Sequence, residues 1–553
     1  MSETGTQPRH VRESLADPKR ALNVQYYGPV GSTTVEEPPT HRTDDDLIAG
    51  LRELAAADET TTEFGSASYV SEFRSRSADR TKNAVDDDFG EADYAVIDRA
   101  TEPVENRAML CVDRLVGTHP ETTFCCRLYV PAEYARIAHG WAMLFDPTDG
   151  RDPDFVTVQV PDASETAIRI LPDDGFTAVV GSDYTGEAKK SFLRLFMHRA
   201  KRLGGLGLHA GSKRVRVARA ADARDEAQAR DEPDAHSERD DETADGTVPD
   251  LETVGQLFMG LSATGKSTLT AHGCWLEAPE EAVMVQDDVC ALLPDGSVAG
   301  SEGGGLYVKT YGLDADEQPG IHAAVTDESA SFENVVVDED GTVDFDDDRY
   351  TKNGRAVIRR SKLPSASEDI DLEDVDQLFF ITRNPLMPPV ARLDDEQAAV
   401  AFMLGESIET SAGDPDRAGE RIRVVGTNPF IIGPEGEEGN RLRELVASLG
   451  LECYVVNTGT VGYPDSDANS KDVGVTESVT ILTELARGTV EWTRDEQLGL
   501  KVPANVPGMD IEAFRVAEYV DDYDGELETL REERREYLES FERLDQEIVD
   551  AVY

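Results

Sequence analysis

A glycine-rich loop between a predicted strand and a predicted helix constrains the fold more than any other feature of this sequence. The stretch "MGLSATGKSTLTAHG", residues 259–273, fits G-x-x-x-x-G-K-[ST], the loop that cradles nucleotide phosphates. The residues before it, "VGQLFM", predict a strand, and "KSTLTAHGC" predicts the start of a helix. This order predicts an α/β domain with a nucleotide site. A glycine-rich turn that matches the pattern by coincidence is the alternative.

The residues of this loop have distinct expected roles. Gly260 and Gly265 allow the backbone amides to point at the phosphates. Lys266 is expected to reach the β- and γ-phosphates, and the Ser267 hydroxyl is expected to ligate the magnesium ion of a nucleotide complex. The predicted nucleotide-binding residues of the loop are Gly260, Ser262, Ala263, Thr264, Gly265, Lys266, Ser267 and Thr268.

Two acidic residues follow the next predicted strand. In "AVMVQDD", Asp287 and Asp288 stand at the end of the strand, about twenty residues after the loop. Carboxylates at this place suit a divalent metal ion. An Asp pair at the end of a strand can also be only a turn, and it is the preceding loop that favours the metal site.

Upstream of the loop, two adjacent lysines stand out in a chain that has only twelve. Lys189 and Lys190 lie in "YTGEAKK", and His209 follows Lys190 by nineteen residues. A surface pair is the simple alternative. A neutral lysine and a neutral histidine can, however, both ligate a divalent metal. The lysine pKa must then fall far below its usual ~10.4, and a nearby cation lowers it.

Seven stretches resemble, in order, the motifs of ATP-dependent phosphoenolpyruvate carboxykinases, and the resemblance covers about residues 76–462. They are "YTGEAKK" for Y-x-G-E-x-K-K, "GLSATGKSTL" for the family's phosphate loop, "QDD" for its metal-binding D-D, "EGGGLYVKT" for E-G-G-C-Y-x-K-T, "FENVVVDEDGTVDFDDDRYTKNGRAVI" for E-N-V-V-x-D, V-D-F-D-D and T-x-N-T-R, "FITRNPLMPPVARL", and "EQAAVAFMLGE". One such stretch would be weak support, but seven in the family's order are strong support.

The resemblance implies a two-domain mixed α/β enzyme, with an N-terminal α/β domain, a C-terminal nucleotide-binding domain that holds the loop, and the active site in the cleft between them. The implied reaction converts oxaloacetate and ATP to phosphoenolpyruvate, carbon dioxide and ADP, a step of gluconeogenesis. Manganese is the implied catalytic metal, and magnesium accompanies ATP. By role, the implied residues are the metal ligands Lys190, His209, Asp288 and Ser267; the catalytic residues Lys189, Lys190, His209, Arg355 and Arg76; the substrate-binding residues Arg76, Tyr184 and Ser262; and, outside the loop, the nucleotide-binding residues Glu302 and Arg355.

The chain departs from the family's pattern at four places. "SRSADRT" replaces G-R-S-P-K-D-K, so Arg74 competes with Arg76 for the assigned role. "HAGSK" replaces H-C-S-A-N, and Val289 and Cys290 follow the D-D pair without a further acid. "DVGVTES" lacks the arginine expected near the adenine, which leaves the choice of ATP over GTP open. The alternatives are a GTP-using carboxykinase, another kinase with this loop, such as the serine kinase of a phosphocarrier protein, and a regulatory nucleotide-binding protein without catalysis.

The charge of the chain is extreme, with 111 acidic against 54 basic residues and a net charge of −57. Self-repulsion of this size predicts a protein adapted to molar salt, although a merely acidic cytosolic protein is the alternative. Such a surface disfavours binding to nucleic acid or to anionic membranes. The resemblance implies small-molecule substrates, oxaloacetate and ATP, as the partners; the oligomeric state stays open, with a monomer favoured.

The remaining composition predicts a cytoplasmic enzyme. The first twenty residues have no apolar core of a signal peptide, and no run of eighteen apolar residues occurs. The six cysteines show no paired C-x-x-C spacing, which favours ordinary buried or half-buried thiols over a zinc site or disulfides.

The chain is predicted to divide into four parts. These are a polar, partly disordered segment over 1–60, an α/β substrate domain over 61–217, an acidic disordered insertion over 218–250, and the nucleotide-binding domain with C-terminal helices over 251–553. The first domain is expected to hold strands at "YAVID", "AMLCVDRLV", "TFCCRLYV", "FVTVQV" and "TAVVG", and a helix at "PAEYARIAHGWAMLF". Residues 526–553 predict a docked surface helix.

Overall fold

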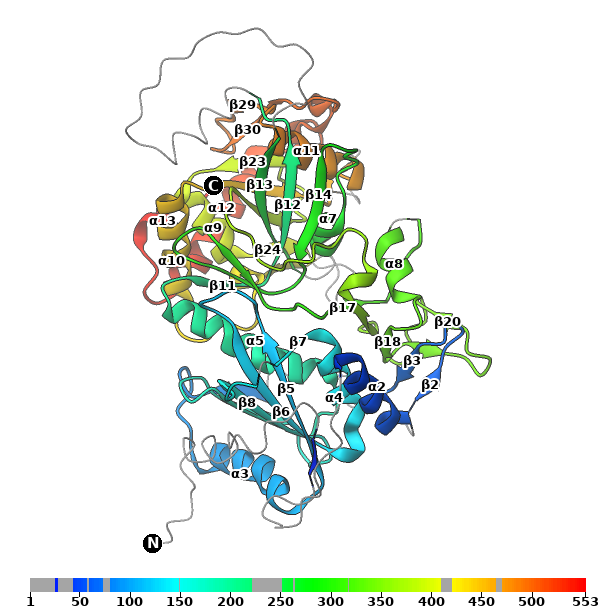
Figure 1. Ribbon diagram of the computed structural model, residues 1–553. Helices are drawn as coiled ribbons and strands as arrows, with labels where there is room; N and C mark the ends of the chain where they lie inside the picture. Colours follow the sequence, from blue (N-terminus) through cyan, green and yellow to red (C-terminus); the bar gives the residue numbers. More distant parts are fainter. Residues whose placement is uncertain are drawn as a thin grey trace, which may run out of the picture. The chain divides into compact units, whose positions relative to one another are not determined.

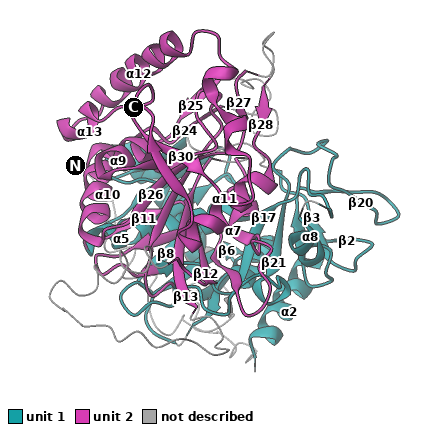
Figure 2. Cartoon of the chain, turned by 90° about the horizontal axis from the view of Figure 1, so that it is seen from above, with its two compact units in different colours: residues 1–203, 299–371, 429–433 teal, residues 204–298, 372–428, 434–553 magenta. Residues whose placement is uncertain are grey.

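The computed structural model describes residues 25–27, 43–56, 59–72, 80–148, 150–220, 251–261, 264–316, 318–408, 420–463 and 470–553 (Figure 1). The chain forms two compact units (Figure 2). Unit 1 comprises Met1–Leu203, Ala299–Asp371 and Pro429–Gly433, and unit 2 comprises Gly204–Val298, Leu372–Asn428 and Pro434–Tyr553. Both contain sheets and helices, so the predicted mixed α/β fold is confirmed.

The larger sheet of unit 1 is mixed and is covered by helices α3 (Glu91–Asn106), α4 (Ala135–Leu144) and α5 (Thr185–Arg202). Along the sheet, the strands are β1 (Gln25–Tyr27), β5 (Met109–Val116), β6 (Phe124–Pro131), β8 (Phe155–Val160), β10 (Phe176–Val180), β9 (Ala167–Leu171) and β4 (Thr81–Asn83), with β7 (Asp146–Pro147) paired to β5. Most residues of β5, β6, β8 and β10 are buried, which fits their almost continuous apolar sequences.

A smaller sheet of unit 1 joins segments far apart in the sequence. Its order is β17 (Gly305–Lys309), β21 (Arg355–Arg359), β18 (Ser331–Glu333), β3 (Ala67–Tyr69) and β2 (Thr60–Thr61). Strand β18 pairs in parallel with β3, so residues 331–333 lie beside 67–69. The same region holds α8 (Pro319–Val325) and the two-stranded pair β19 (Val336–Val337) and β20 (Val343–Asp344). This pairing explains why 299–371 belongs to unit 1.

The main sheet of unit 2 carries the glycine-rich loop. Its order is β14 (Glu281–Gln286), β12 (Ala210–Val217), β13 (Glu252–Met259), β22 (Gln377–Thr382), β26 (Glu452–Asn457), β23 (Val390–Leu393), β30 (Lys501–Asn505) and β29 (Glu491–Arg494). The three central strands β13, β22 and β26 are parallel, so their carboxyl ends meet at one edge. The rings of Phe258, Phe379 and Tyr454 stack across these strands with centroid distances of 4.9 and 5.4 Å.

Helices and short strands complete unit 2. The helices are α7 (Lys266–Ala271), α9 (Asp395–Leu404), α10 (Glu435–Leu449), α11 (Val475–Arg487), α12 (Tyr523–Glu539) and α13 (Gln546–Asp550). The short paired strands are β11 (Leu206–Leu208) with β15 (Cys290–Leu292), β24 (Glu406–Ile408) with β25 (Arg421–Arg423), and β27 (Thr460–Val461) with β28 (Lys471–Asp472). Strand β16 (Val298–Gly300), where the chain passes from unit 2 to unit 1, pairs with β15.

Most predicted elements are confirmed, and one is wrong. The strand predicted at "YAVID", residues 94–98, is part of helix α3. Val96, Ile97, Ala100 and Val104 are buried in the core of the sheet, at helical rather than alternating spacing. The Asp93 side chain accepts a hydrogen bond from the Gly90 amide (3.0 Å) at the start of the helix. A five-residue apolar window was too short to distinguish the two patterns.

Two predicted helices are confirmed, but the burial of one and the continuity of the other differ from the prediction. Helix α4 falls within 131–145 as expected, but all ten of its residues are buried instead of one face, because it contacts α2 (Asp44–Ala55), α5 and several strands. The C-terminal segment is docked through Leu527, Leu530 and Leu538, and it breaks after α12 before α13 begins.

The predicted disorder at 1–60 and 218–250 falls mainly on residues outside the described ranges. Within the first segment, α2 is an ordered helix whose Thr43 side chain accepts a hydrogen bond from the Asp46 amide (3.1 Å). The contiguous domain division at 217 and 251 stays a prediction; the units described above are interleaved in sequence.

The six cysteines are buried and none of them forms a disulfide, as predicted. Among the described residues, no helix is both long and apolar enough to cross a membrane.

Candidate active site

The glycine-rich loop joins β13 to α7, and its glycines are there for two different reasons. Gly265 has φ +95°, a left-handed conformation that side chains with a Cβ rarely adopt. At Gly260, a Cβ would lie 2.6 Å from Oγ1 of Thr264, so the close approach of the loop requires glycine. The Thr264 hydroxyl donates to the carbonyl of Leu261 (2.8 Å), which holds the turn before α7.

One carboxylate contacts both the loop lysine and the predicted histidine ligand. Asp288 follows β14, and its Oδ1 lies 3.0 Å from Nε2 of His209 and 3.6 Å from Nζ of Lys266. The Lys266 side chain is only 9% exposed, and among the described residues its Nζ has no hydrogen-bond partner. A buried ammonium that retains free donors is suited to an anionic ligand such as a phosphate.

The other nitrogen of His209 is held by the backbone. Nδ1 lies 2.7 Å from the carbonyl oxygen of Thr427, which can only accept, so Nδ1 carries a proton. In a neutral ring, Nε2 is then the lone-pair nitrogen, and it faces Asp288. Thr427 itself has φ +52° and follows Gly426 with φ +58°, so the carbonyl is presented by a strained turn.

A neighbouring carboxylate has an unsatisfied oxygen. Oδ1 of Asp287 is buried and has no hydrogen-bond partner among the described residues. An anionic oxygen in this state is suited to a cation. No group of three or more His, Cys, Asp and Glu side chains within the described ranges is arranged to hold a metal ion. A metal at His209 and Asp288 therefore needs a ligand of another type, such as a lysine amine, a substrate oxygen or water.

The helix that carries Lys266 and Ser267 is tied to the strand that follows His209. Lys213 on β12 is completely buried, and its Nζ donates to the carbonyls of Leu269 and His272 at the end of α7, the second at 2.8 Å. Burial lowers the pKa of Lys213. This lysine stands where the family's H-C-S-A-N pattern has asparagine, and it links the loop helix to the histidine strand.

In unit 1, the second turn of α5 carries the lysine pair. Lys189 is 4% exposed, and its Nζ lies 3.0 Å from Oε1 of the buried Glu302. Lys190 is half-buried, with Nζ 3.4 Å from Oε1 of Glu187. Each ammonium also lies over an aromatic ring: Lys189 over Tyr307 (5.6 Å) and Lys190 over Tyr184 (5.3 Å). The pair is therefore not the simple surface pair that the alternative assumed.

The same two tyrosines connect to the predicted arginine. The Arg355 guanidinium lies over the Tyr307 ring (5.6 Å), and its Nη2 donates to Oδ1 of Asn353 (2.9 Å). The Asn353 side chain donates in turn to the Tyr184 hydroxyl (3.3 Å). The arrangement gathers three cations, Lys189, Lys190 and Arg355, around one pair of rings, a cationic environment that suits an anionic substrate.

A buried glutamate supports this arrangement. Glu333 accepts from the Tyr307 hydroxyl (2.5 Å) and from the Thr185 amide at the start of α5 (2.9 Å). Its Oε1 also lies 3.4 Å from Nη1 of Arg136. Burial raises the pKa of Glu333, and the charge of Arg136 opposes that shift. Sequence reasoning missed Tyr307, Glu333 and Asn353 as site residues, although each lies in a stretch that resembles a family motif.

The structure places the predicted residues in two sets. Unit 2 brings together His209, Asp288 and Lys266, with Gly260, Thr264, Gly265, Ser267 and Thr268 in or beside the loop. Unit 1 brings together Tyr184, Lys189, Lys190, Glu302 and Arg355. Arg76, its competitor Arg74, Ser262 and Ala263 lie outside the described residues.

Comparison with known proteins decides the family. The sequence profile described as phosphoenolpyruvate carboxykinase matches residues 79–512. The chain belongs to the phosphoenolpyruvate carboxykinase family. It is 35% identical over 486 residues to the phosphoenolpyruvate carboxykinase (ATP) of Aeropyrum pernix, a match that covers 87% of this chain and 90% of that protein. The enzymes of the same name from Mesorhizobium japonicum and Rhizobium leguminosarum are 29% and 28% identical, each over 63% of this chain and 58% of the relative.

Membership of the carboxykinase family bears on the alternatives. The match extends well beyond the loop, through both the lysine pair and the Arg355 segment, so it does not favour another kinase that shares only the loop. The relatives named above carry ATP, not GTP, in their names.

Proposed function

We propose that this chain is an ATP-dependent phosphoenolpyruvate carboxykinase, which converts oxaloacetate and ATP to phosphoenolpyruvate, carbon dioxide and ADP. The observation that carries the proposal is the contact of Asp288 with both Lys266 and His209, because one carboxylate then joins a phosphate-binding lysine to a metal-binding histidine. Family membership over residues 79–512 supports the same reaction.

The residues present fit a manganese ion. The lone-pair nitrogen of His209 and an oxygen of Asp288 converge at 3.0 Å, and imidazole and carboxylate are ligands that a divalent transition metal accepts. We propose Lys190 as the third protein ligand, since it is half-buried and its ammonium forms a long ion pair of 3.4 Å with Glu187. When bound there, the metal would supply positive charge that stabilises the enolate of pyruvate.

The chemistry has two steps. Decarboxylation breaks the bond between C3 of oxaloacetate and its C4 carboxylate, and the bond electrons form the enolate. The enolate oxygen then attacks the γ-phosphorus of ATP in line, and ADP leaves. Lys189 and Arg355 are proposed to neutralise the transferring phosphoryl group and the oxaloacetate carboxylates, because both are cations near the Tyr307 ring.

The other proposed roles follow the same division. Lys266 neutralises the β- and γ-phosphates, and Ser267 ligates the magnesium ion that accompanies ATP. Arg76, Tyr184 and Ser262 bind the substrate, and the Tyr184 hydroxyl is already oriented by Asn353. Glu302 is proposed to lie near the nucleotide; its contact with Lys189 gives it the further task of compensating a buried ammonium.

The enzyme is proposed to work in the cytoplasm on small molecules, and as a monomer. Six free, buried thiols fit a reducing compartment. Size-exclusion chromatography with light scattering in molar salt tests the monomer, which has a chain mass of 60.4 kDa.

The proposed reaction is tested by bicarbonate fixation onto phosphoenolpyruvate, measured with manganese in high salt. ADP and GDP are compared as phosphoryl acceptors, and the oxaloacetate formed is followed with a coupled dehydrogenase. We expect ADP-dependent turnover that GDP does not match. A folded protein that forms no oxaloacetate with either nucleotide contradicts the proposal. A preference for GDP over ADP would instead identify a GTP-using carboxykinase.

A further inference from the structure

An arginine with no role in the reaction described above lies beside the nucleotide loop. Arg383 comes directly after β22, which lies between β13 and β26 in the parallel centre of the unit 2 sheet. Ligands of such sheets bind outside the carboxyl ends of the strands. Strand β13 leads at this same edge into the phosphate loop, so Arg383 is placed where a nucleotide would lie.

Specific contacts connect Arg383 to the loop. The amide of Thr458 donates to the carbonyl of Thr382 (2.9 Å), and the Thr458 hydroxyl donates to the carbonyl of Thr264 (2.7 Å). The next residue, Gly459, is packed against the arginine: a Cβ there would lie 3.1 Å from Cβ and 3.2 Å from Cγ of Arg383. The stem of Arg383 and the phosphate loop therefore rest on the same two residues, 458–459.

The charge of Arg383 is not matched by an acid. Among the described residues, no ion pair or side-chain hydrogen bond involves its guanidinium, and its Nε is buried. In a chain with 111 acidic and 54 basic residues, such an arginine is unexpected. Burial alone lowers the pKa of Arg383. A partly buried cation without a counter-charge carries a desolvation cost that an anionic ligand would offset.

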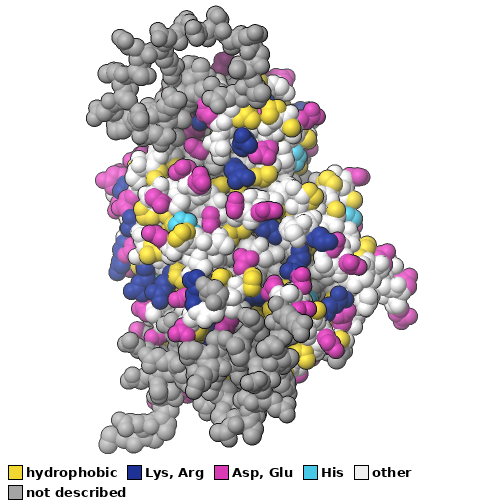
Figure 3. Space-filling view, viewed as in Figure 1, with side chains coloured by type: hydrophobic (Ala, Val, Ile, Leu, Met, Phe, Trp, Pro, Cys, Tyr) yellow, Lys and Arg dark blue, Asp and Glu magenta, His cyan; other side chains and the backbone are white. Residues whose placement is uncertain are grey.

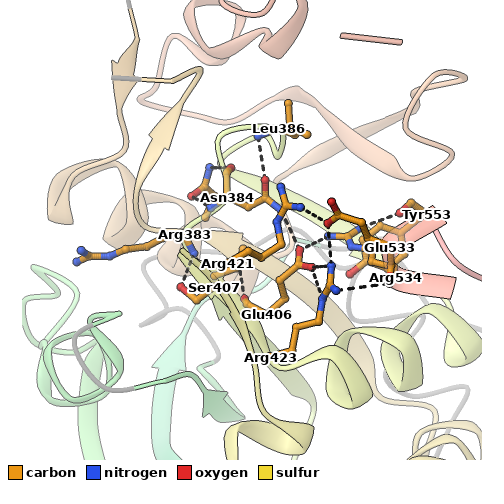
Figure 4. Close-up of polar contacts among 12 residues, drawn as sticks. Arg383, Asn384, Leu386, Glu406, Ser407, Arg421, Arg423, Glu533, Arg534 and Tyr553 are labelled. Carbon is orange, nitrogen blue, oxygen red and sulfur yellow. Dashed lines mark hydrogen bonds and ion pairs between the residues drawn. The ribbon is translucent and has the colours of Figure 1, made fainter. Parts of the chain in front are cut away.

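Neighbouring arginines show the contrast. Arg421, Arg423 and Arg534 all pair with Glu406 or Glu533, within a cluster close to the Arg383 backbone (Figure 4). The backbone of Arg383 takes part in this region, since its amide donates to the Ser407 hydroxyl (3.1 Å). Its side chain points away from the cluster and its carboxylates (Figure 4).

We propose that Arg383 binds the phosphate chain of the nucleotide, an inference that rests on the proposed nucleotide site of the glycine-rich loop. The planar guanidinium can donate two parallel hydrogen bonds to phosphate oxygens. The sequence lacks the arginine expected near the adenine at 472–478, and Arg383 does not replace it, since its task is on the phosphates and not on the base.

The test compares ADP with adenosine, which shares the base and ribose but has no phosphates. Dissociation constants are measured by calorimetry, at one fixed high salt concentration, for wild type, Arg383→Gln and Arg383→Lys. The loss of a charge-assisted phosphate contact is expected to raise the dissociation constant of ADP by roughly 10- to 100-fold in Arg383→Gln, and to leave that of adenosine unchanged. Arg383→Lys keeps the positive charge but loses the planar pair of donors, and it is expected to bind ADP with intermediate affinity.

The matched control is Arg392→Gln, because Arg392 is a half-buried arginine of the same sheet that pairs with Glu452 (3.4 Å). It is expected to bind ADP as wild type does. If Arg383→Gln binds ADP with wild-type affinity, the inference is wrong even when the carboxykinase assay succeeds. If Arg383→Gln does not fold, wild-type ADP affinity in Arg383→Lys overturns it instead. Arg383-dependent ADP binding in a protein without carboxykinase activity supports this inference and contradicts the proposed reaction.

Discussion

At the scale of single residues, Asp288 is the residue that connects the parts of the candidate site in unit 2. Its oxygen is shared by a histidine nitrogen at 3.0 Å and a lysine ammonium at 3.6 Å. In the proposed function, nucleotide phosphates would compete with Asp288 for Lys266 and so change the charge around the carboxylate that faces His209. The proposed nucleotide and metal sites would then be connected electrostatically within unit 2.

Replacing Lys266 by alanine is expected to reduce turnover by at least ~10²-fold, the scale of one preorganised contact with the transition state. The loop backbone and α7 remain, so the protein should fold with an unchanged circular dichroism spectrum. Lys362→Ala is the control, because Lys362 is a half-exposed lysine of unit 1 that pairs with Asp327 (2.9 Å). Steady-state kinetics make the comparison. Wild-type turnover in the Lys266 variant would contradict the proposed role of the loop in phosphoryl transfer.

Sequence reasoning found the residues of the site that stand in short, recognisable patterns. Lys266 follows from the loop pattern alone, and Asp288 follows from a strand end after that loop. Arg383 lies within the family-like stretch "FITRNPLMPPVARL", but no pattern marked Arg383 or Thr427 as a site residue, because their placement depends on where distant strands end. Lys213 was visible as a departure from a motif, but its contacts with the carbonyls of α7 exist only once β12 packs beside that helix.

At the scale of elements, a buried ionic cluster joins the C-terminal helices to the β24–β25 hairpin. Glu406 on β24 accepts from Nε of Arg423 on β25 (2.9 Å) and from Arg534 on α12 (2.9 Å), and Asn384 adds a further donor (3.0 Å). Arg534 also donates to the carbonyl of Tyr553 (2.6 Å), the last residue (Figure 4). The cluster thus connects α12 and Tyr553 to strand β24, which contacts the Arg383 backbone.

The cluster predicts a pH-dependent effect of Arg534→Met. Burial acts to raise the pKa of Glu406, but Arg534 and Arg423 outweigh it and lower the pKa to about 2. Because the folded pKa lies below the ordinary 4.5, this contribution to stability is present above pH 4.5 and is lost as the pH falls toward 2. Removing one partner of a buried pair should reduce the free energy of unfolding by about 3–5 kcal/mol at pH 7.

Urea unfolding of wild type and Arg534→Met at pH 7, 5 and 4 measures this difference, which should shrink between pH 5 and 4. Arg535→Met is the matched control, because Arg535 is exposed on the same helix and should change the free energy of unfolding little. A loss in Arg534→Met that is small, or that stays constant with pH, would show that the cluster contributes no net electrostatic stabilisation.

Elements were predicted best where the pattern was long. Strands β5, β6 and β8 have long, continuous apolar runs. The short run at 94–98 was misassigned for lack of length. Burial around all of α4 was not predictable either, because it depends on the helices and strands that surround it and not on its own periodicity.

At the scale of the whole molecule, the large negative charge is the property most expected to affect stability. Acidic side chains are spread among basic ones over the described surface on the face that Figure 3 shows, instead of forming one patch. With a net charge of −57, repulsion between them is expected to expand the protein as the screening length grows. The interleaved units could not be predicted from the sequence, since the parallel pairing of β18 with β3 leaves no local trace.

Folding and activity are therefore expected to require molar salt. Lowering the salt concentration to ~0.1 M increases the screening length to ~10 Å. The melting temperature should fall steadily as the salt concentration is lowered. Differential scanning calorimetry from 3 M potassium chloride downward gives the dependence. A melting temperature that stays constant down to ~0.1 M salt would leave an ordinary acidic protein as the better description.

The central proposal is that Lys190, His209 and Asp288 hold one manganese ion, and manganese titration by electron paramagnetic resonance tests it most directly. His209→Ala is the most informative variant, because Asp288 also contacts Lys266 and its replacement would disturb the nucleotide site. His198→Ala, a histidine of α5 outside the proposed site, is the control. We predict that the His209, Lys190 and Asp288 variants bind manganese much more weakly than wild type, while His209→Ala still binds ADP. If all three variants bind manganese as wild type does, the assigned site is wrong, and Asp287 with Glu302 becomes the place to look.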